Sequence, residues 1–251
     1  MVQLVVACHA AAEAGKSPRV RIPDYSVRSY LMRAGFQAAL EGVATIEPAA
    51  YWDPYQLHRG SNPMLIEVTR IDDCSDLPEI LDQIVDVLIG TLSYQKYDAF
   101  DVATAVSEVS QNIFDHNSTR RPYGFLAMQV YGASGGQFLE IGIADCADGL
   151  AASLSRNPKN GTIRSDVDAI LRAVKIGTSE YDEPTRGSGL YHLLEIAYRH
   201  QGRVQIRSGS GKVRYRGDKR QGWSFNVGRL PGVQVALMLG SREETAVLAH
   251  A

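Results

Sequence analysis

Cysteine is scarce in this chain, and its three cysteines, Cys8, Cys74 and Cys146, form no C-x-x-C pair. A disulfide framework or a cysteine-based zinc motif is therefore not expected. Scattered, unpaired thiols are typical of reduced cysteines in a cytosolic protein. We accordingly predict a cytoplasmic location.

Long apolar runs are also missing, since none approaches the roughly 18 residues that a membrane-spanning helix needs. The apolar N-terminus, residues 1–8, has no positive charge before it, which favours an amphipathic helix over a signal peptide. Neither sign of charge is in large excess, because the net charge is only −2. We therefore expect no membrane partner and no nucleic-acid partner.

The hydrophobic content of 45% and charged content of 22% are those of a globular protein. Hydrophobic spacing predicts helices over residues 2–15, 25–40, 77–92, 100–116, 167–174 and 190–200. Alternating patterns predict strands over residues 19–22, 64–68, 124–131, 137–144, 203–208, 212–216, 223–227 and 232–239. Blocks of helices and strands favour an α+β fold, with helices on one face of a mixed sheet.

One polar row on the expected helix over residues 100–116 is a candidate site. At about 100° per residue, Glu108, Asn112 and His116 lie roughly 90° from the apolar stripe of that helix. Such a row borders the core, so its side chains can point into a cleft between helix and sheet. The alternative is a solvated polar face. For His116, a histidine favoured by the helix C-terminus is an equal alternative.

Two further segments have the composition of a ligand site. The expected strand over residues 137–144 runs into Asp145, which is followed by Ala147 and Gly149. Later, Gly187-Ser188-Gly189-Leu190 precedes a helix, and glycines there expose N–H groups that can hold phosphate oxygens. Nearby basic and hydroxyl side chains are candidates to contact the same phosphates, or are ordinary exposed residues: Lys175, Thr178, Ser179 and Arg186.

Taken in this order, these three segments resemble the nucleotide-binding boxes of the GHKL ATPases, over roughly residues 64–240. The resemblance implies a two-layer α/β sandwich of the Bergerat (histidine-kinase-like ATPase) type that binds ATP and Mg²⁺. In that family the residue matching Asn112 is the magnesium ligand, that matching Glu108 orients or activates the attacking group, and that matching Asp145 binds the adenine amino group. ATP contacts are likewise implied along the other matching positions: His116, Ala147, Gly149, Lys175, Thr178, Arg186, Gly187, Ser188, Gly189 and Leu190.

Two positions depart from the family pattern. Ala147 stands where a glycine is usual, and its methyl group restricts the backbone next to the adenine. Val233 replaces a threonine that is frequent in the family, which removes a hydroxyl contact. Residues 150–186 correspond to the lid over the nucleotide.

Residues 1–47 resemble the second half of a STAS-like domain, on the strength of residues 30–36. Half a domain cannot bury a sheet alone, so this segment either packs on the ATPase domain or continues a domain that starts upstream. Prolines and a glycine in residues 48–63 predict a linker, which leaves residues 64–240 as the ATP-binding domain and 241–251 as a tail.

The resemblance implies an anti-sigma-factor-like, partner-switching serine/threonine kinase whose partner is a STAS-type protein. The chain contains no phosphoacceptor His-Glu dimerisation helix, which disfavours autophosphorylation; a homodimer stays open. The alternatives are a nucleotide-binding interaction module without phosphotransfer, and a simple ATP hydrolase. The basic run over residues 212–220 either contacts nucleic acid or forms a solvated hairpin, and we favour the hairpin.

Overall fold

The computed structural model describes residues 1–48, 65–115, 123–133, 136–175 and 188–241. Among these residues, no helix is both long and apolar enough to cross a membrane. The elements of the first part are α1 (Val2–Glu13), β1 (Arg19–Arg21), α2 (Tyr25–Arg33), α3 (Phe36–Ala39) and β2 (Thr45–Glu47). Those of the second part are β3 (Leu65–Ile71), η3 (Cys74–Asp76), α4 (Leu77–Gly90), α5 (Lys96–Asp115), β4 (Gly124–Ala133), β5 (Gly136–Asp145), α6 (Leu150–Ser155), η4 (Pro158–Asn160), α7 (Asp166–Ala173), α8 (Gly189–Arg199), β6 (Arg203–Arg216) and β7 (Gln221–Gly240).

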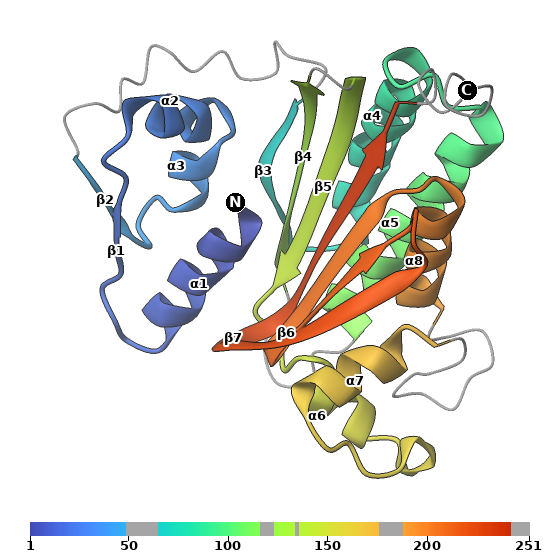
Figure 1. Ribbon diagram of the computed structural model, residues 1–251. Helices are drawn as coiled ribbons and strands as arrows, with labels where there is room; N and C mark the ends of the chain where they lie inside the picture. Colours follow the sequence, from blue (N-terminus) through green and yellow to red (C-terminus); the bar gives the residue numbers. More distant parts are fainter. Residues whose placement is uncertain (49–64, 116–122, 134–135, 176–187, 242–251) are drawn as a thin grey trace.

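A five-stranded sheet in the order β3-β4-β5-β7-β6 forms the centre of the molecule (Figure 1). All neighbouring strands in it are antiparallel. The expected α+β class is confirmed, but the expected mixed sheet is wrong. The two parallel strands of the described chain, β1 and β2, pair in a separate small sheet.

One face of the large sheet packs against α4, α5 and α8. Their apolar side chains and those of the sheet form the main core, which includes the predicted stripe of α5: Val102, Val106, Val109 and Ile113. Because these positions repeat every three or four residues, they lie on one side of the helix. Its neighbouring polar row therefore faces the boundary of the core.

The opposite face of the sheet is covered by α1, which contacts β4, β5 and β7 (Figure 1). Val5 and Val6 of α1 are fully buried, and Phe36 and Phe125 belong to the same second core. The expectation of helices on one face therefore holds for α4, α5 and α8 but not for the whole molecule. Of the two alternatives for the N-terminal segment, the structure shows packing on the sheet.

Side-chain caps define several helix starts. The Asp24 carboxylate accepts a hydrogen bond from the Val27 N–H at 3.0 Å, and the Ser165 hydroxyl accepts one from the Asp168 N–H at 3.0 Å. Such caps satisfy N–H groups that have no partner within the helix. They explain why α2 and α7 begin one residue after Asp24 and Ser165.

The structure differs from the expected elements at three places. The helix over residues 25–40 is interrupted at Gly35, whose φ of +73° separates α2 from α3. The four expected C-terminal strands are joined into two elements, β6 and β7, whose pairing shifts register near Gly209. The expected break is nevertheless visible as a reversal of β6, since the Gly217 N–H donates to the Gly202 carbonyl oxygen at 2.8 Å. Helix α6 was not expected, and it begins directly after Gly149.

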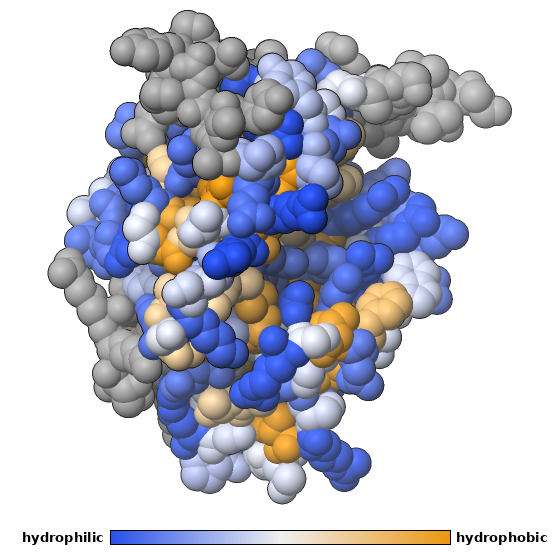
Figure 2. Space-filling view, turned by 90° about the vertical axis from the view of Figure 1, so that its left-hand side faces the viewer, coloured by the Kyte–Doolittle hydropathy of each residue, from blue (hydrophilic) through white to orange (hydrophobic). Residues whose placement is uncertain are grey.

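The left-hand face of the molecule carries mainly hydrophilic side chains with hydrophobic ones between them, as Figure 2 shows. This is the usual pattern of a protein surface, since polar atoms alone cannot cover it. The predicted linker (residues 48–63) and tail (residues 241–251) lie almost entirely outside the described residues.

Candidate functional site

The three segments singled out in the sequence meet at one cavity of about 50 Å³ between α5, the end of β5, α6, α8 and β7. Five of the predicted site residues line it: Asn112, Asp145, Ala147, Gly149 and Leu190. Most of the remaining wall is apolar, including Val109, Ile143 and Leu150. The wall therefore combines a hydrophobic enclosure with a few polar groups, as ligand sites do.

Among the described residues of the wall, Asp145 provides the one carboxyl group, at the end of β5. It is buried, with 6% of its surface exposed. Its Oδ1 accepts a hydrogen bond from the Ala147 N–H at 2.7 Å, and its Oδ2 accepts one from the Val233 N–H at 3.1 Å. Removal from water raises the pKa of Asp145 to about 6, although the two hydrogen bonds oppose that rise.

These two hydrogen bonds give Ala147 and Val233 a role that depends on their backbone. The resemblance stated from the sequence treats both positions as departures, because of their side chains. Here each contributes a main-chain N–H to Asp145. The carboxyl group is thus held from two sides, by the turn after β5 and by β7, whatever the side chains are.

Glu108 and Asn112 lie one turn apart on α5, as the predicted polar row requires. Asn112 reaches the cavity, whereas Glu108 lies against the start of α8. A side-chain carbon at Gly189 would stand only 3.1 Å from Glu108 Cβ. The glycine at this position therefore allows α8 to approach α5 closely.

His192 on α8 is a site residue that the sequence did not reveal. Its Nδ1 lies 3.5 Å from Glu108 Oε2, a buried oxygen with no hydrogen-bond partner among the described residues. Its Nε2 lies 2.8 Å from Asp101 Oδ1, and Arg199 donates to Asp101 Oδ2 at 2.5 Å. The spacing of Asp101 and Glu108, seven residues or two turns apart on α5, is the one signal that places both carboxylates on the same side of the helix.

Asp101 anchors this chain of contacts as an ionised group. Partial burial raises the pKa of the carboxyl group, but the hydrogen bonds from His192 and Arg199 outweigh it, so the pKa lies below its usual value. An ionised Asp101 holds the imidazole of His192 in one orientation. The imidazole in turn limits where Glu108 can lie.

The remaining predicted residues are separate from the cavity or outside the description. Lys175 follows α7, is exposed and does not line the cavity. Ser188 precedes α8 as its N-cap, without a side-chain capping bond. His116, Thr178, Ser179, Arg186 and Gly187 lie outside the residues that the structure describes.

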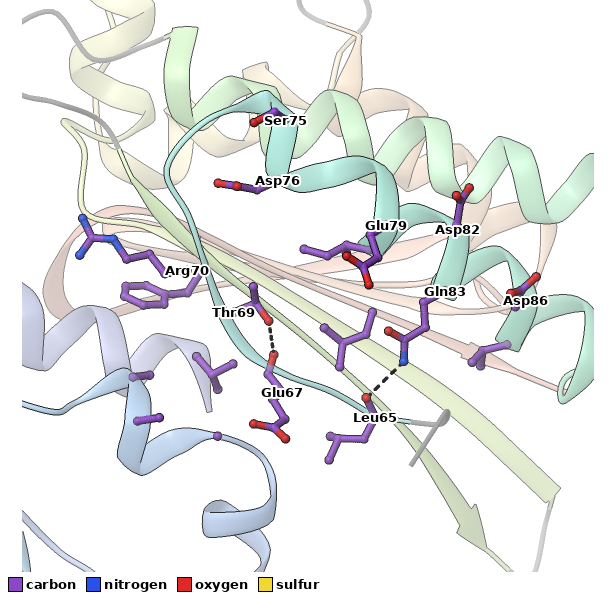
Figure 3. A pocket seen from close by; sticks show the side chains of 18 of the residues that line it. Leu65, Glu67, Thr69, Arg70, Ser75, Asp76, Glu79, Asp82, Gln83 and Asp86 are labelled. Atoms are coloured by element: carbon purple, nitrogen blue, oxygen red, sulfur yellow. Dashed lines mark hydrogen bonds between the residues drawn. The ribbon is translucent and has the colours of Figure 1, made fainter. Parts of the chain in front are cut away.

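A much larger groove, of about 1,340 Å³, lies between α3, β3 and α4 (Figure 3). Six carboxylates line it: Glu41, Glu67, Asp76, Glu79, Asp82 and Asp86. Its basic residue Arg70 is paired with Asp72 at 3.0 Å. A negative groove of this kind repels a triphosphate, so it is not a candidate for binding phosphates despite its size.

Within the described parts of the chain, no three His, Cys, Asp or Glu side chains are grouped to hold a metal ion. A magnesium ion at the smaller cavity would depend on the Asn112 side-chain oxygen together with phosphate oxygens and water. That is a normal mode of magnesium binding in nucleotide sites.

No protein-family model matches this chain, and no curated protein matches it either.

Proposed function

We propose that this protein is an ATP-binding regulatory protein of the histidine-kinase-like ATPase type. The observation that supports this best is the convergence of Asn112, Asp145, Gly149 and Leu190 on one cavity. These residues come from three segments spread over some 80 positions of the sequence. Their order along the chain resembles that of a nucleotide site, and the fold brings them together independently of that resemblance.

Asp145 would bind the adenine amino group. Each of its carboxylate oxygens accepts one backbone hydrogen bond and retains a further lone pair. A base with an amino group can donate to it, whereas guanine presents a carbonyl oxygen at the corresponding position. Because a buried acceptor left without a donor is unfavourable, this contact would discriminate ATP from GTP.

The start of α8 and the Asn112 side chain would bind the phosphate end. N–H groups in the first turn of a helix have no partner within the helix and carry partial positive charge. Mg²⁺, when bound, supplies positive charge that offsets the charge of the phosphates. Asn112 would hold that ion through its carbonyl oxygen.

Glu108 would orient or accept the proton of an attacking hydroxyl group, with His192 limiting its position. Phosphoryl transfer depends chiefly on positioning and on charge neutralisation. The attacking group we propose is a serine or threonine of a STAS-type partner, as in a partner-switching kinase. A binding module without transfer and a simple ATP hydrolase are the alternatives.

The size of the cavity sets a condition on this proposal. About 50 Å³ accommodates one or a few water molecules, whereas ligand sites usually span about 300–1,000 Å³. A nucleotide therefore enters only if the walls separate. Two wall residues lie at the starts of helices: Leu150 in the short helix α6, and Leu190 in the first turn of α8. Nucleotide binding is therefore expected to displace α6 and α8 from β5.

Calorimetric titration with ATP, with and without Mg²⁺, tests the proposal. We expect magnesium-dependent binding that exceeds GTP binding, is lost in Asp145→Ala and loses its magnesium dependence in Asn112→Ala. Asp148→Ala is the matched control, because Asp148 is exposed and pairs with Arg156 outside the cavity. No binding by the unaltered chain, or equal loss in the control, contradicts a nucleotide site here.

Glu108→Ala separates the three readings of the site. A kinase or hydrolase would keep nucleotide binding and lose turnover in this variant. A pure binding module would show no turnover before the substitution and would keep nucleotide-dependent affinity for its partner after it.

A further inference from the structure

The outer half of the β6–β7 hairpin carries positive charge on one face. Lys212 lies opposite Phe225, and Arg214 lies opposite Trp223 in the strand register. The intervening β6 residues, Val213 and Tyr215, are buried in the core on the side of the helices. Since side chains alternate along a strand, Lys212 and Arg214 lie on the opposite face.

Earlier residues of β6 extend the same face. Val204 and Ile206 are buried in the helix-side core, so Arg203 and Arg207 lie on the other side with Lys212 and Arg214. Helix α1 covers this side of the sheet over β4, β5 and β7. The hairpin end lies beside the residues that follow α8, where the Gly217 N–H donates to the Gly202 carbonyl oxygen at 2.8 Å.

The two aromatic side chains on this face are partly open to solvent. Trp223 is 38% exposed and Phe225 is 43% exposed. The Lys212 ammonium and the Arg214 guanidinium each lie 5.7 Å from the centre of the Phe225 ring. These cation–π contacts favour the observed position of the Phe225 ring. They do not neutralise the positive charges of Lys212 and Arg214.

Residues 203–229 contain eight Lys and Arg and only one acidic residue, Asp218, although the whole chain has a net charge of −2. Asp218 pairs with Arg216 at 2.6 Å. In the described parts of the chain, neither Lys212 nor Arg214 forms an ion pair. Partial burial, followed by the nearby Arg214 and Arg207, lowers the pKa of Lys212. The positive charges on this face therefore oppose one another.

We propose that this face of the β6–β7 hairpin binds single-stranded nucleic acid, through phosphate contacts with Lys212 and Arg214 and base stacking on Trp223 and Phe225. Alternate residues of a strand are about 7 Å apart, close to the spacing of successive phosphates in an extended single strand. Cations that follow the backbone and exposed rings that stack bases are the two elements of sequence-independent single-strand binding.

This inference differs from the expectation drawn from the net charge. A net charge describes the whole molecule, whereas a polyanion responds to the local field of one face. The acidic groove near β3 and the basic face of β6 occupy opposite edges of the same sheet. Their charges nearly cancel in the sum while remaining far apart. The inference is independent of the proposed nucleotide site.

Fluorescence anisotropy with a labelled oligothymidylate of about 20 nucleotides tests the proposal on the full chain. We expect salt-dependent binding that weakens at least about tenfold in Lys212→Ala/Arg214→Ala. Loss of two phosphate contacts should lower the slope of log affinity against log salt by about 1.4. Trp223→Ala should weaken binding about fivefold or more and leave the slope unchanged, because stacking releases no counterions.

Arg19→Ala/Arg21→Ala is the matched control, since it removes the same charge from exposed positions of β1. In a Trp52→Phe background, Trp223 is the only tryptophan, so quenching of its fluorescence by the oligonucleotide reports stacking directly. Absence of binding, an equal loss in the control, or no quenching overturns the proposal. Tighter binding to the matching duplex overturns the proposal in favour of duplex DNA. Equally tight binding to polyglutamate, if Trp223→Ala does not weaken it, overturns the proposal in favour of an acidic protein.

Discussion

At the scale of single residues, the carboxyl group of Asp145 is subject to two opposing effects. Burial favours its neutral form, while the N–H groups of Ala147 and Val233 favour its charged form. Burial is the larger effect, and the group is poised to change charge near pH 6. A group of this kind at a cavity wall is a candidate for function.

Asp145 should make the stability of the protein depend on pH in a specific direction. Its pKa is higher in the folded protein than in the unfolded chain, so the folded state binds more protons between about pH 4 and pH 6. Its contribution to the free energy of unfolding is therefore present at low pH and is lost as the pH rises through this window. Between pH 4 and pH 7, we expect the stability of the unaltered protein relative to Asp145→Asn to fall by about 2 kcal/mol.

Urea unfolding of both proteins across this pH range provides the measurement. Asp145→Asn serves as the reference for the unaltered protein, because the two proteins share all other titrating groups. Parallel stability curves would show that Asp145 has an ordinary pKa in the folded protein.

His192 should affect the rate of phosphoryl transfer more than nucleotide binding. If it positions Glu108, His192→Ala lowers kcat by about 10- to 100-fold, because small misplacements of reacting groups have effects of that size. The ATP dissociation constant should change by less than about twofold, and His192→Gln should restore part of the rate. Arg199→Ala is the control, since Arg199 donates to Asp101 Oδ2, whereas His192 contacts Asp101 Oδ1. An unchanged kcat, or a loss of binding that parallels the loss of rate, would refute the positioning role.

The residues of the site were only partly predictable from the sequence. Asp145 and Asn112 could be found because each lies at a fixed place in a periodic element, the end of a strand or the edge of an apolar stripe. His192 could not, since its contacts with Asp101 and Glu108 span more than 80 residues and depend on how α8 crosses α5. No local pattern contains that information.

At the scale of elements, hydrophobic periodicity predicted the long helices α4, α5 and α8 within a few residues. It was wrong at Gly35, where the periodic pattern continues through a residue whose φ is +73°. There tertiary contacts override the local pattern. In β6, by contrast, the expected turn near Gly209 and Gly211 is present within one continuous element, because Arg214 Nε donates to the Gln205 side chain at 2.8 Å and the strand must therefore reverse between them.

Gly35→Ala should destabilise the attachment of the N-terminal segment to β3. The left-handed backbone alone is unfavourable for alanine by about 1–2 kcal/mol. In addition, the new carbon would lie 2.9 Å from Glu67 Cβ and 3.2 Å from the Val68 nitrogen. That nitrogen donates to the Ala34 carbonyl oxygen at 2.8 Å, so the clash acts on the bond that joins the two parts.

Gly42→Ala is the matched control for this prediction. Gly42 has a similar φ of +70°, but a side-chain carbon there meets nothing within 4 Å. Thermal unfolding should therefore show a larger loss for Gly35→Ala than for Gly42→Ala. Equal losses would mean that only the backbone conformation matters and that the contact with β3 is easily relaxed.

At the scale of the whole molecule, the sheet has a helix layer on each side. The sequence led us to treat residues 1–47 as a separate segment before a linker. In the structure, Val5 and Val6 of α1 are fully buried together with Phe125 and Ala127 of β4. The sequence did not show this contact. Apolar residues on that face of β4 predict that the face is buried, but they do not indicate which part of the chain covers it.

We expect the N-terminal segment and the sheet to unfold as one cooperative unit. Phe36 is fully buried in the second core, and Phe36→Ala should lower the free energy of unfolding by about 3–5 kcal/mol. Within each protein, circular dichroism and near-ultraviolet absorbance should report one shared midpoint, and that midpoint should be lower in Phe36→Ala. Two separate transitions, with only the first sensitive to Phe36→Ala, would contradict a single unit.

The central position of β5 determines which part of the backbone is best protected. Its neighbours are β4 and β7, and helices cover both faces of the sheet at this point. Deuterium should therefore replace the amide protons of β5 last, and only through global unfolding, while β3 and β6 at the two edges exchange through smaller openings. Since Asp145 ends β5, the proposed adenine contact is attached to the slowest-exchanging strand, and α6 and α8 can separate from it while it stays in place.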